Sequence, residues 1–411
     1  MNQELLGQRL RQAREVAGIS QQVAAEVISA PRTAVTQIES GKRSVSSLEL
    51  TKLAAIYHRP IMYFLEENMD EDEDIFVALH RAAPDLVDTP EVRHRVNLCV
   101  DLCREGAALE RLLGRVDRSG PPAYVEKVPS KPGEAINQGE HVAEQERRRL
   151  GIGSAPIADM ADLIAGQGIW ASGADLPDDM SGLFLRHRSI GLAILVNADH
   201  PRGRKRFSYA HEYAHALLDR DRTVTVSNKD NAAELVEKRA NAFAAAFLMP
   251  AEGVTELLRS LDKGQSSRSE RAIFDAATGG RIQTESRPAP GSQQITYQDA
   301  AMIAHHFGVS YQAATYRLLS LKHISHKDCE ALLGQTETGK DYLRALDMLD
   351  ELEEPEDKKM WTRELRSQVV HLALEAYRRE EISRGKLLDI SKTVNISADV
   401  MLDLAEAARA A

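Results

Sequence analysis

Two histidines and a glutamate stand at a spacing that suits metal chemistry. His211, Glu212 and His215 occur together in the segment Phe207–Leu218. If this segment is a helix, His211 and His215 lie four residues apart on one face and can bind the same ion. Neutral imidazoles suit Zn²⁺, and Glu212 is placed to take a proton from an attacking water. The pattern predicts a zinc site with Glu212 as the general base. A purely structural histidine pair is the alternative.

A third protein ligand is needed, because zinc hydrolases use three and leave a fourth position for water. The next expected helix, Glu234–Pro250, offers Glu237 and Asn241, which stand four apart on one face. One of them could bind the ion while the other forms a hydrogen bond to a ligand histidine. Glu234, one turn earlier, competes for the ligand role. No residue stands out as the group that would stabilise the tetrahedral oxyanion.

These side chains need rigid elements to hold them. Alanine and leucine fill the rest of the histidine segment, which is typical of a buried helix. Strands are expected at 168–172, 182–186 and 190–197, separated by Gly, Asp and Pro turns. Thr296, with Asp299 three residues later, predicts the start of a further helix after a Gly-, Ser- and Pro-rich stretch.

Around this site the chain resembles the ImmA/IrrE family of zinc metallopeptidases. The resemblance rests on Arg206-Phe207 before the histidine helix and on a later helix of the form E-x-x-A-N-x-F-A-x-x-[LF]-L-M-P, which is Glu237–Pro250 here. It runs from about 140 to 262 and, more weakly, over 297–321. The stretch at about 263–295 looks like an insertion.

This resemblance implies an α+β, zincin-like fold with a small sheet and Zn²⁺ as the cofactor. By the match, His211, His215 and Glu237 are the metal ligands, and Asn241 supports a ligand histidine. The implied activity is that of a metalloendopeptidase of narrow specificity. The implied substrate is a regulatory protein, often a repressor.

The first 66 residues are expected to form short helices joined by sharp turns. Ser20 suits the N-cap of one helix, and Pro31 suits the first turn of the next. Gly41 can supply the left-handed residue that ends the second helix. The inward positions are expected to be Val23, Val27, Ile28, Val35 and Ile38. This arrangement is typical of a helix-turn-helix, whose second helix enters the DNA major groove.

Here the chain resembles the XRE family of DNA-binding domains over about residues 3–66, although Ser29 stands where that family commonly has Gly. The resemblance implies five helices, a double-stranded DNA operator as partner and a homodimer on a two-fold site. By motif position, the major-groove face carries Arg32, Thr33, Thr36 and Gln37, and the phosphate contacts fall to Gln21, Lys42 and Arg43. A surface helix that touches no DNA is the alternative.

Length and composition allow several domains. The chain has 411 residues, 43% of them hydrophobic, which is enough for sizeable cores. Its 52 basic and 62 acidic residues give a net charge of −10, which argues against coating nucleic acid along the whole chain. Three cysteines do not make a secreted disulfide scaffold. We find no signal core or membrane-length apolar run, and so expect a cytoplasmic protein without membrane contact.

Composition divides this mainly α-helical chain into four parts. Residues 1–66 form the DNA-binding domain, and 67–135 form an acidic stretch, a helical connector and a Gly/Pro linker. Residues 136–335 form the peptidase domain, and 336–411 form a helical C-terminal region. Residues 66–74 carry seven acids in nine positions. That run is expected to be a solvated linker, with a DNA-mimicking segment as the alternative.

Two functions fit these features. The first is a zinc endopeptidase tethered to a DNA reader, which cleaves a repressor-type protein and so switches on stress, phage-defence or mobile-element genes. The second is a DNA-binding regulator or antitoxin whose peptidase-like domain senses a signal or holds a partner without cutting it.

Overall fold

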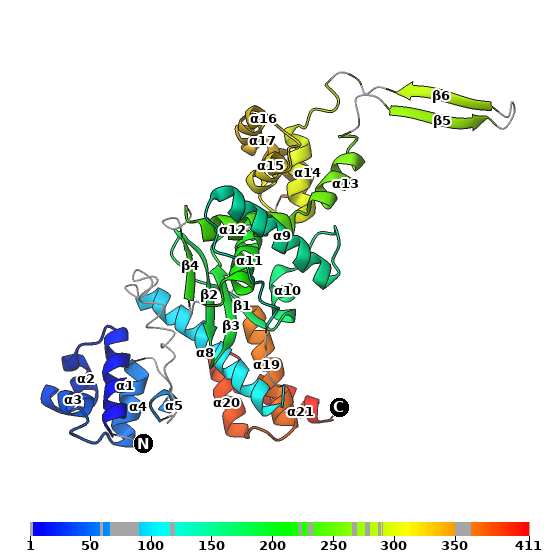
Figure 1. Cartoon of the computed structure of the whole chain (residues 1–411). Coiled ribbons are helices and arrows are strands. Elements are labelled where there is room, and N and C mark those ends of the chain that lie inside the picture. The colour runs from blue at the N-terminus through cyan, green and yellow to red at the C-terminus, as the bar shows by residue number, and fades with distance from the viewer. Residues whose placement is uncertain are drawn as a thin grey trace.

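The computed structural model describes residues 3–57, 61–65, 90–115, 120–221, 224–228, 233–264, 269–275, 280–286, 289, 291–349 and 363–410. The described chain is mainly helical, with one four-stranded mixed sheet and one two-stranded hairpin (Figure 1). The predicted fold class is confirmed. The acidic run 66–74 lies outside the described residues.

Five short helices form the N-terminal domain, as predicted: α1 (Gln3–Val16), α2 (Gln21–Val27), α3 (Arg32–Glu39), α4 (Ser47–Ile56) and α5 (Ile61–Leu65). Ser20 caps α2 by accepting a hydrogen bond from the Val23 amide. Ser29 takes the left-handed conformation in the turn, with φ at 56°. Gly41 is also left-handed, and a Cβ there would lie 2.8 Å from the Cα of Glu4. The turn between α2 and α3 therefore forms without glycine.

The core of this domain departs from the prediction at one position. Val35 and Ile38 are buried as expected, but the Val23 side chain is 43% exposed. The small Ala24 and Ala25 occupy the inward face of α2 instead, which lets the neighbouring helices approach closely. A buried ion pair, with 2.5 Å between Arg14 Nε and Glu39 Oε1, ties α1 to α3.

A four-stranded sheet lies at the centre of the chain. Its strands are β1 (Ile169–Ala174), β2 (Met180–His187), β3 (Gly191–Asn197) and β4 (Val224–Asn228), in the order β1-β3-β2-β4. The β1–β3 pair is parallel and the other two pairs are antiparallel. The sequence predicted the first three strands and missed β4, which has only five residues.

A layer of helices lies on one face of the sheet. These helices are α9 (Pro132–Leu150), α10 (Met160–Gly166), α11 (Arg202–Leu218) and α12 (Leu235–Leu248), and the candidate metal ligands lie on α11 and α12. Phe184, Ile194 and Val196 point to this face and join a core that contains Tyr213 and Phe243. The alternation of side chains along the strands sends their neighbours to the opposite face.

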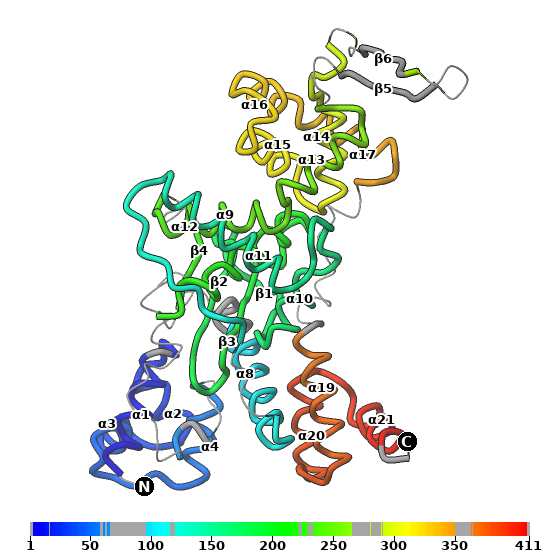
Figure 2. Tube along the Cα trace, turned by 45° about the vertical axis from the view of Figure 1, so that its right-hand side comes forward, coloured from blue at the N-terminus to red at the C-terminus, as the bar shows by residue number. Residues whose placement is uncertain are grey.

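The opposite face is covered by elements from both ends of the chain. Leu183, Leu185 and Leu195 join Trp170 in a second core, together with α8 (Pro90–Leu112). The same core includes α19 (Arg363–Arg378), α20 (Arg384–Thr393) and α21 (Ala398–Ala410). Both views place α8 and α19 side by side beneath the sheet (Figures 1 and 2). The C-terminal region therefore packs on the central sheet.

The two segments that looked loose in the sequence both carry order. Helix α9 begins already at Pro132, inside the predicted Gly/Pro linker. The preceding residues are anchored, because the Tyr124 amide donates to the Leu217 carbonyl over 2.8 Å and its hydroxyl donates to Glu146 over 2.9 Å. The segment before α9 therefore packs on the central body, although its composition is typical of a flexible linker.

The predicted insertion 263–295 contains the antiparallel hairpin of β5 (Ser269–Asp275) and β6 (Gly280–Ser286), which projects from the body (Figure 1). It follows α13 (Ala251–Ser260) and precedes a helical unit of α14 (Tyr297–Phe307), α15 (Tyr311–Ser320), α16 (His326–Leu333) and α17 (Thr336–Ala345). Thr296 and Asp299 form the expected capping box of α14. None of the described helices is long and apolar enough to cross a membrane.

We predict that Gly106→Ala destabilises the fold by about 1–3 kcal/mol, because overpacking a tight core forces side chains to shift. A Cβ at this position of α8 would lie 2.4 Å from the Trp170 ring. Urea unfolding followed by tryptophan fluorescence measures the change. Gly133→Ala, which meets nothing within 4 Å, is the matched control. Equal unfolding midpoints for the two variants would contradict the close packing of α8 on the sheet.

Candidate metal centre

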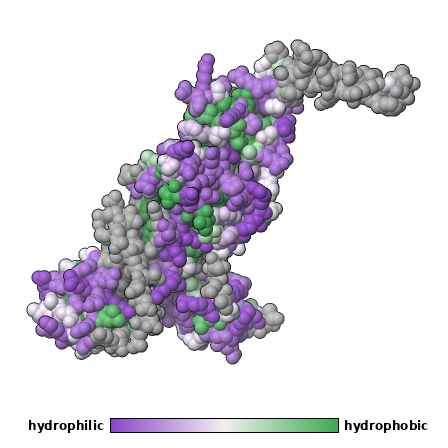
Figure 3. All heavy atoms as spheres, in the orientation of Figure 1, coloured by the Kyte–Doolittle hydropathy of each residue, from purple (hydrophilic) through white to green (hydrophobic). Residues whose placement is uncertain are grey.

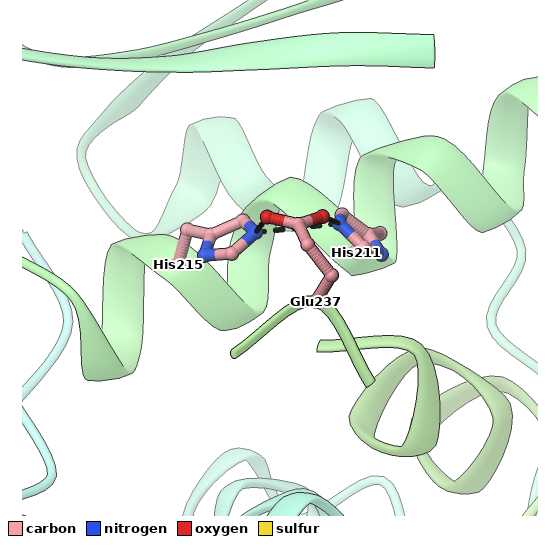
Figure 4. A group of neighbouring side chains, drawn as sticks. All are labelled: His211, His215 and Glu237. Atoms are coloured by element: carbon pink, nitrogen blue, oxygen red, sulfur yellow. Dashed lines mark hydrogen bonds and ion pairs between the residues drawn. The ribbon is translucent and has the colours of Figure 1, made fainter. Parts of the chain in front are cut away.

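Three buried side chains converge between α11 and α12. His211 and His215 lie on one face of α11, and the Glu237 carboxylate reaches between them from α12 (Figure 4). One Glu237 oxygen is 3.0 Å from His211 Nε2, and the other is 3.5 Å from His215 Nε2. The two Nε2 atoms are 3.3 Å apart. This set of two imidazole nitrogens and one carboxylate matches the protein ligands of a hydrolytic zinc site, so these residues fit the ion.

Helix α11 is held in place by the core around it. Tyr213 donates a hydrogen bond to Glu146 of α9, and its ring contacts Phe243 and Phe247 of α12. Tyr213 therefore faces away from the ligands. Arg206, from the Arg-Phe pair, donates to the carbonyls of Ala158, Ile157 and Phe307. These bonds fix the start of α11 against two separate segments.

A second layer of hydrogen bonds orients both imidazoles. His211 Nδ1 lies 2.9 Å from Asn241 Oδ1, and His215 Nδ1 lies 2.9 Å from Asp219 Oδ2. Arg239 donates to the other Asp219 oxygen over 2.5 Å. With each Nδ1 donating to an oxygen, each Nε2 is left to face an ion. Asn241 was predicted here, whereas Asp219 and Arg239 were not.

Electrostatics in the cluster reflect the pairing of buried charges. Burial by itself would raise the pKa of Glu237, but hydrogen bonds from His211 and His215 lower it to about 2. Burial would lower the pKa of His215, but its bonds to Asp219 and Glu237 raise it to about 10. The carboxylates of Asp219 and Glu237 thus favour a positive charge on or beside the His215 imidazole, whether it is carried by a proton or by a metal ion.

Glu212 follows His211 on α11, and its side chain packs against β2 of the sheet. Its side chain is fully buried, and neither carboxylate oxygen has a hydrogen-bond partner among the described residues. Gly182 of β2 makes room for it, since a Cβ there would lie 2.8 Å from Glu212 Oε1. Burial raises the pKa of Glu212, although the charges of His211 and His215 and the nearby Ser227 hydroxyl oppose this. Burying a carboxylate is costly, and such groups cluster at functional sites.

The structure separates the competing ligand candidates. Glu234 occupies the N-cap position of α12, where it is exposed and outside the cluster. Within the described part of the chain, no other group of three His, Cys, Asp or Glu side chains converges in this way. Cys99 and Cys103 are buried in α8 and belong to the second core of the sheet.

The predicted DNA-contacting residues lie on one surface of the N-terminal domain. Along α3 the exposed side chains are Arg32, Thr33, Thr36 and Gln37, and Lys42 after it is also exposed. Gln21 accepts hydrogen bonds from Arg32 and Thr36 and donates to Glu39 over 2.8 Å. Arg43 is half-buried and donates to Glu49 over 2.7 Å. Gln21 and Arg43 therefore already have protein partners.

Two segments of the chain match known domain families. Residues 166–277 match the family model of the IrrE N-terminal-like domain, and residues 5–61 match that of a helix-turn-helix domain. The chain joins these two domains. The IrrE-like match spans the sheet and both ligand helices and stops between β5 and β6.

Comparison with whole proteins adds little. A crystal structure of Bacillus thuringiensis PlcR in complex with the peptide PapR7 and DNA aligns over 98% of this chain and 99% of that one, at 12% identity. Its TM-score of 0.16 is too low to support any argument from the likeness. No curated protein matches the chain.

We predict that Asp219→Asn weakens zinc binding by about 10- to 100-fold, because the partner that orients the His215 imidazole and supports its charge is lost. Competition with a chromophoric chelator measures the affinity of the full chain. Asp389→Asn, which changes an exposed carboxylate of α20, is the control. Equal zinc affinities for the two variants would show that Asp219 does not support the site.

Proposed function

We propose that this protein is a DNA-binding transcriptional regulator that carries a zinc-dependent endopeptidase. The observation that supports this most directly is the pairing of a complete three-residue ligand set with the fully buried carboxylate of Glu212 next to it. A structural metal site needs no such group, and its burial costs stability. A catalytic role for Glu212 would explain why this destabilising carboxylate is present.

The chain's own residues account for the chemistry. His211, His215 and Glu237 would hold the ion, and Asn241 and Asp219 would fix the two imidazoles. A bound zinc ion would polarise the scissile carbonyl and lower the pKa of water. Glu212, with a pKa raised by burial, would accept the proton of the attacking water and pass it to the leaving amide nitrogen.

The N-terminal domain would direct this activity to DNA. Residues 1–67 carry eight basic and seven acidic side chains, so one copy offers little electrostatic affinity. A homodimer on a two-fold operator would double the contacts. We infer that the protein acts in the cytoplasm and cleaves a repressor-type protein, so that stress, phage-defence or mobile-element genes are released.

A second function is favoured by the enclosure of the site. His215 and Glu212 are fully buried, and His211 and Glu237 nearly so. A site closed in this way would suit a regulator or antitoxin whose peptidase-like domain holds a signal or partner without cutting it. Catalysis would instead require the site to open for its substrate.

We predict that Glu212→Gln keeps the zinc but lowers peptide cleavage by at least about 100-fold, because the general base is removed while the ligands remain. The test follows a proteome-derived peptide mixture and the intact mass of the protein over time, with metal content measured on the same samples. Wild type and the zinc-free His215→Ala variant are the controls. Unchanged cleavage in Glu212→Gln would refute this mechanism, and zinc-loaded wild type that cleaves nothing would favour the regulator.

We predict that Arg32→Ala or Gln37→Ala weakens operator binding by about 1–3 kcal/mol and leaves zinc content unchanged. Each variant removes one of the base contacts proposed for α3. The operator is first selected from random double-stranded DNA with the purified protein, and affinity is then measured by fluorescence anisotropy. Arg11→Ala, on the exposed side of α1, is the control. Wild-type affinity in both α3 variants would remove this face from the interface.

A further inference from the structure

A groove of about 690 Å³ lies beside the metal centre. One wall comes from α9, α11 and α12, and the other from α15 and α17. Its apolar lining includes Phe207, Ala242, Ala245, Tyr316 and Leu343. The Tyr316 side chain is 57% exposed. The surface view shows apolar side chains gathered over the α14–α17 unit among hydrophilic ones (Figure 3). The volume lies within the range of ligand-binding clefts.

Positive charge dominates the polar lining of this groove. The one acid in the lining, Glu140, is neutralised by Arg317 over 2.5 Å. Arg204, Lys238 and Lys340 remain, and Lys340 lies 3.3 Å from Glu337. Among the described residues, neither Arg204 nor Lys238 forms an ion pair. An occupant with apolar side chains and negative charges would complement both the apolar lining and the basic side chains of the groove.

The groove comes within one helical turn of two metal ligands. Phe207 stands one turn before His211 on α11, and Asn241 stands one turn after Glu237 on α12. Both line the groove, and the exposed Asn241 is the residue that holds the His211 imidazole. An extended chain lying in the groove would therefore pass close to the residues that would hold the ion. This placement favours a peptide substrate, because a peptide bond must come close to the hydrolytic centre. A small molecule that is only bound would not need to lie near that centre.

We infer that this groove binds the substrate of the proposed peptidase and selects a segment in which apolar residues alternate with Asp or Glu. The apolar side chains lie on Phe207, Ala242 and Ala245, and the acids face Arg204 and Lys238. Arg204, in the first turn of α11 where positive charge opposes the helix dipole, then has a partner of opposite charge. This inference rests on the proposed function, because the groove matters as a substrate site only if the centre cleaves peptides.

The binding test uses the full-length chain with Glu212→Gln, so that no cleavage intervenes. The probes are two fluorescein-labelled decapeptides of Leu and Phe, one interspersed with Asp and Glu and the other with Lys. Fluorescence anisotropy should show that the acidic peptide binds at least about tenfold more tightly and that its affinity falls as salt is added. Adding Arg204→Glu and Lys238→Glu should reverse this preference. Arg384→Glu with Lys392→Glu, on the exposed surface of α20, is the control of equal charge.

A second arm uses zinc-loaded wild type and the proteome-derived peptides. Cleaved peptides should be enriched in Asp and Glu on one side of the cut, and the Arg204→Glu, Lys238→Glu variant should lose that enrichment while keeping its zinc. Cleavage with no acid enrichment would overturn the groove assignment and leave the peptidase intact. Selective, reversible binding without any cleavage by wild type would contradict the proposed function and leave a peptide-binding groove. Displacement of the acidic peptide by dodecanoate, again without cleavage, would overturn the inference in favour of a small amphiphilic acid.

Discussion

The centre of this protein depends on holding two imidazoles and a carboxylate together out of water. Buried charges are stable only when each has a partner in good geometry. Here the partners come in layers, with Glu237 between the histidines, Asn241 and Asp219 behind them, and Arg239 behind Asp219. Each layer belongs to α11, α12 or the turn that follows α11. The relative position of these two helices is therefore the constraint that the remaining packing must satisfy.

The packing around the two helices meets that constraint. The aromatic contacts of Tyr213 with Phe243 and Phe247 set the spacing of α11 and α12, and the sheet supports them from below. The sheet can do so because its other face is covered as well, by α8 and the three C-terminal helices. Elements that are far apart in the sequence thus stabilise the same site from opposite sides.

Features encoded by neighbouring residues were predictable from the sequence, whereas features that depend on contacts between distant segments were not. Local patterns predicted the ligand pair His211 and His215, and a local resemblance identified Glu237 and the five N-terminal helices. Asp219 and Arg239 escaped prediction because a carboxylate four residues after a histidine is common and becomes meaningful only when an arginine from another helix joins it. Strand β4 escaped because five residues carry too little periodicity. Val23 was misplaced since two alanines, rather than the larger valine, fit the crowded inward face of α2.

The second core of the sheet changes what counts as a domain in this chain. Cutting at the compositional boundaries 136 and 335 would retain all of the metal ligands but remove α8 and α19–α21. Leu183, Leu185, Leu195 and Trp170 would then face water as a continuous apolar surface. Such a fragment would be prone to aggregate even though its chemistry is complete. Helix α8 and the C-terminal helices α19–α21 cover the same face of the sheet. Exchange of either segment alone for one of different shape would therefore disrupt that core.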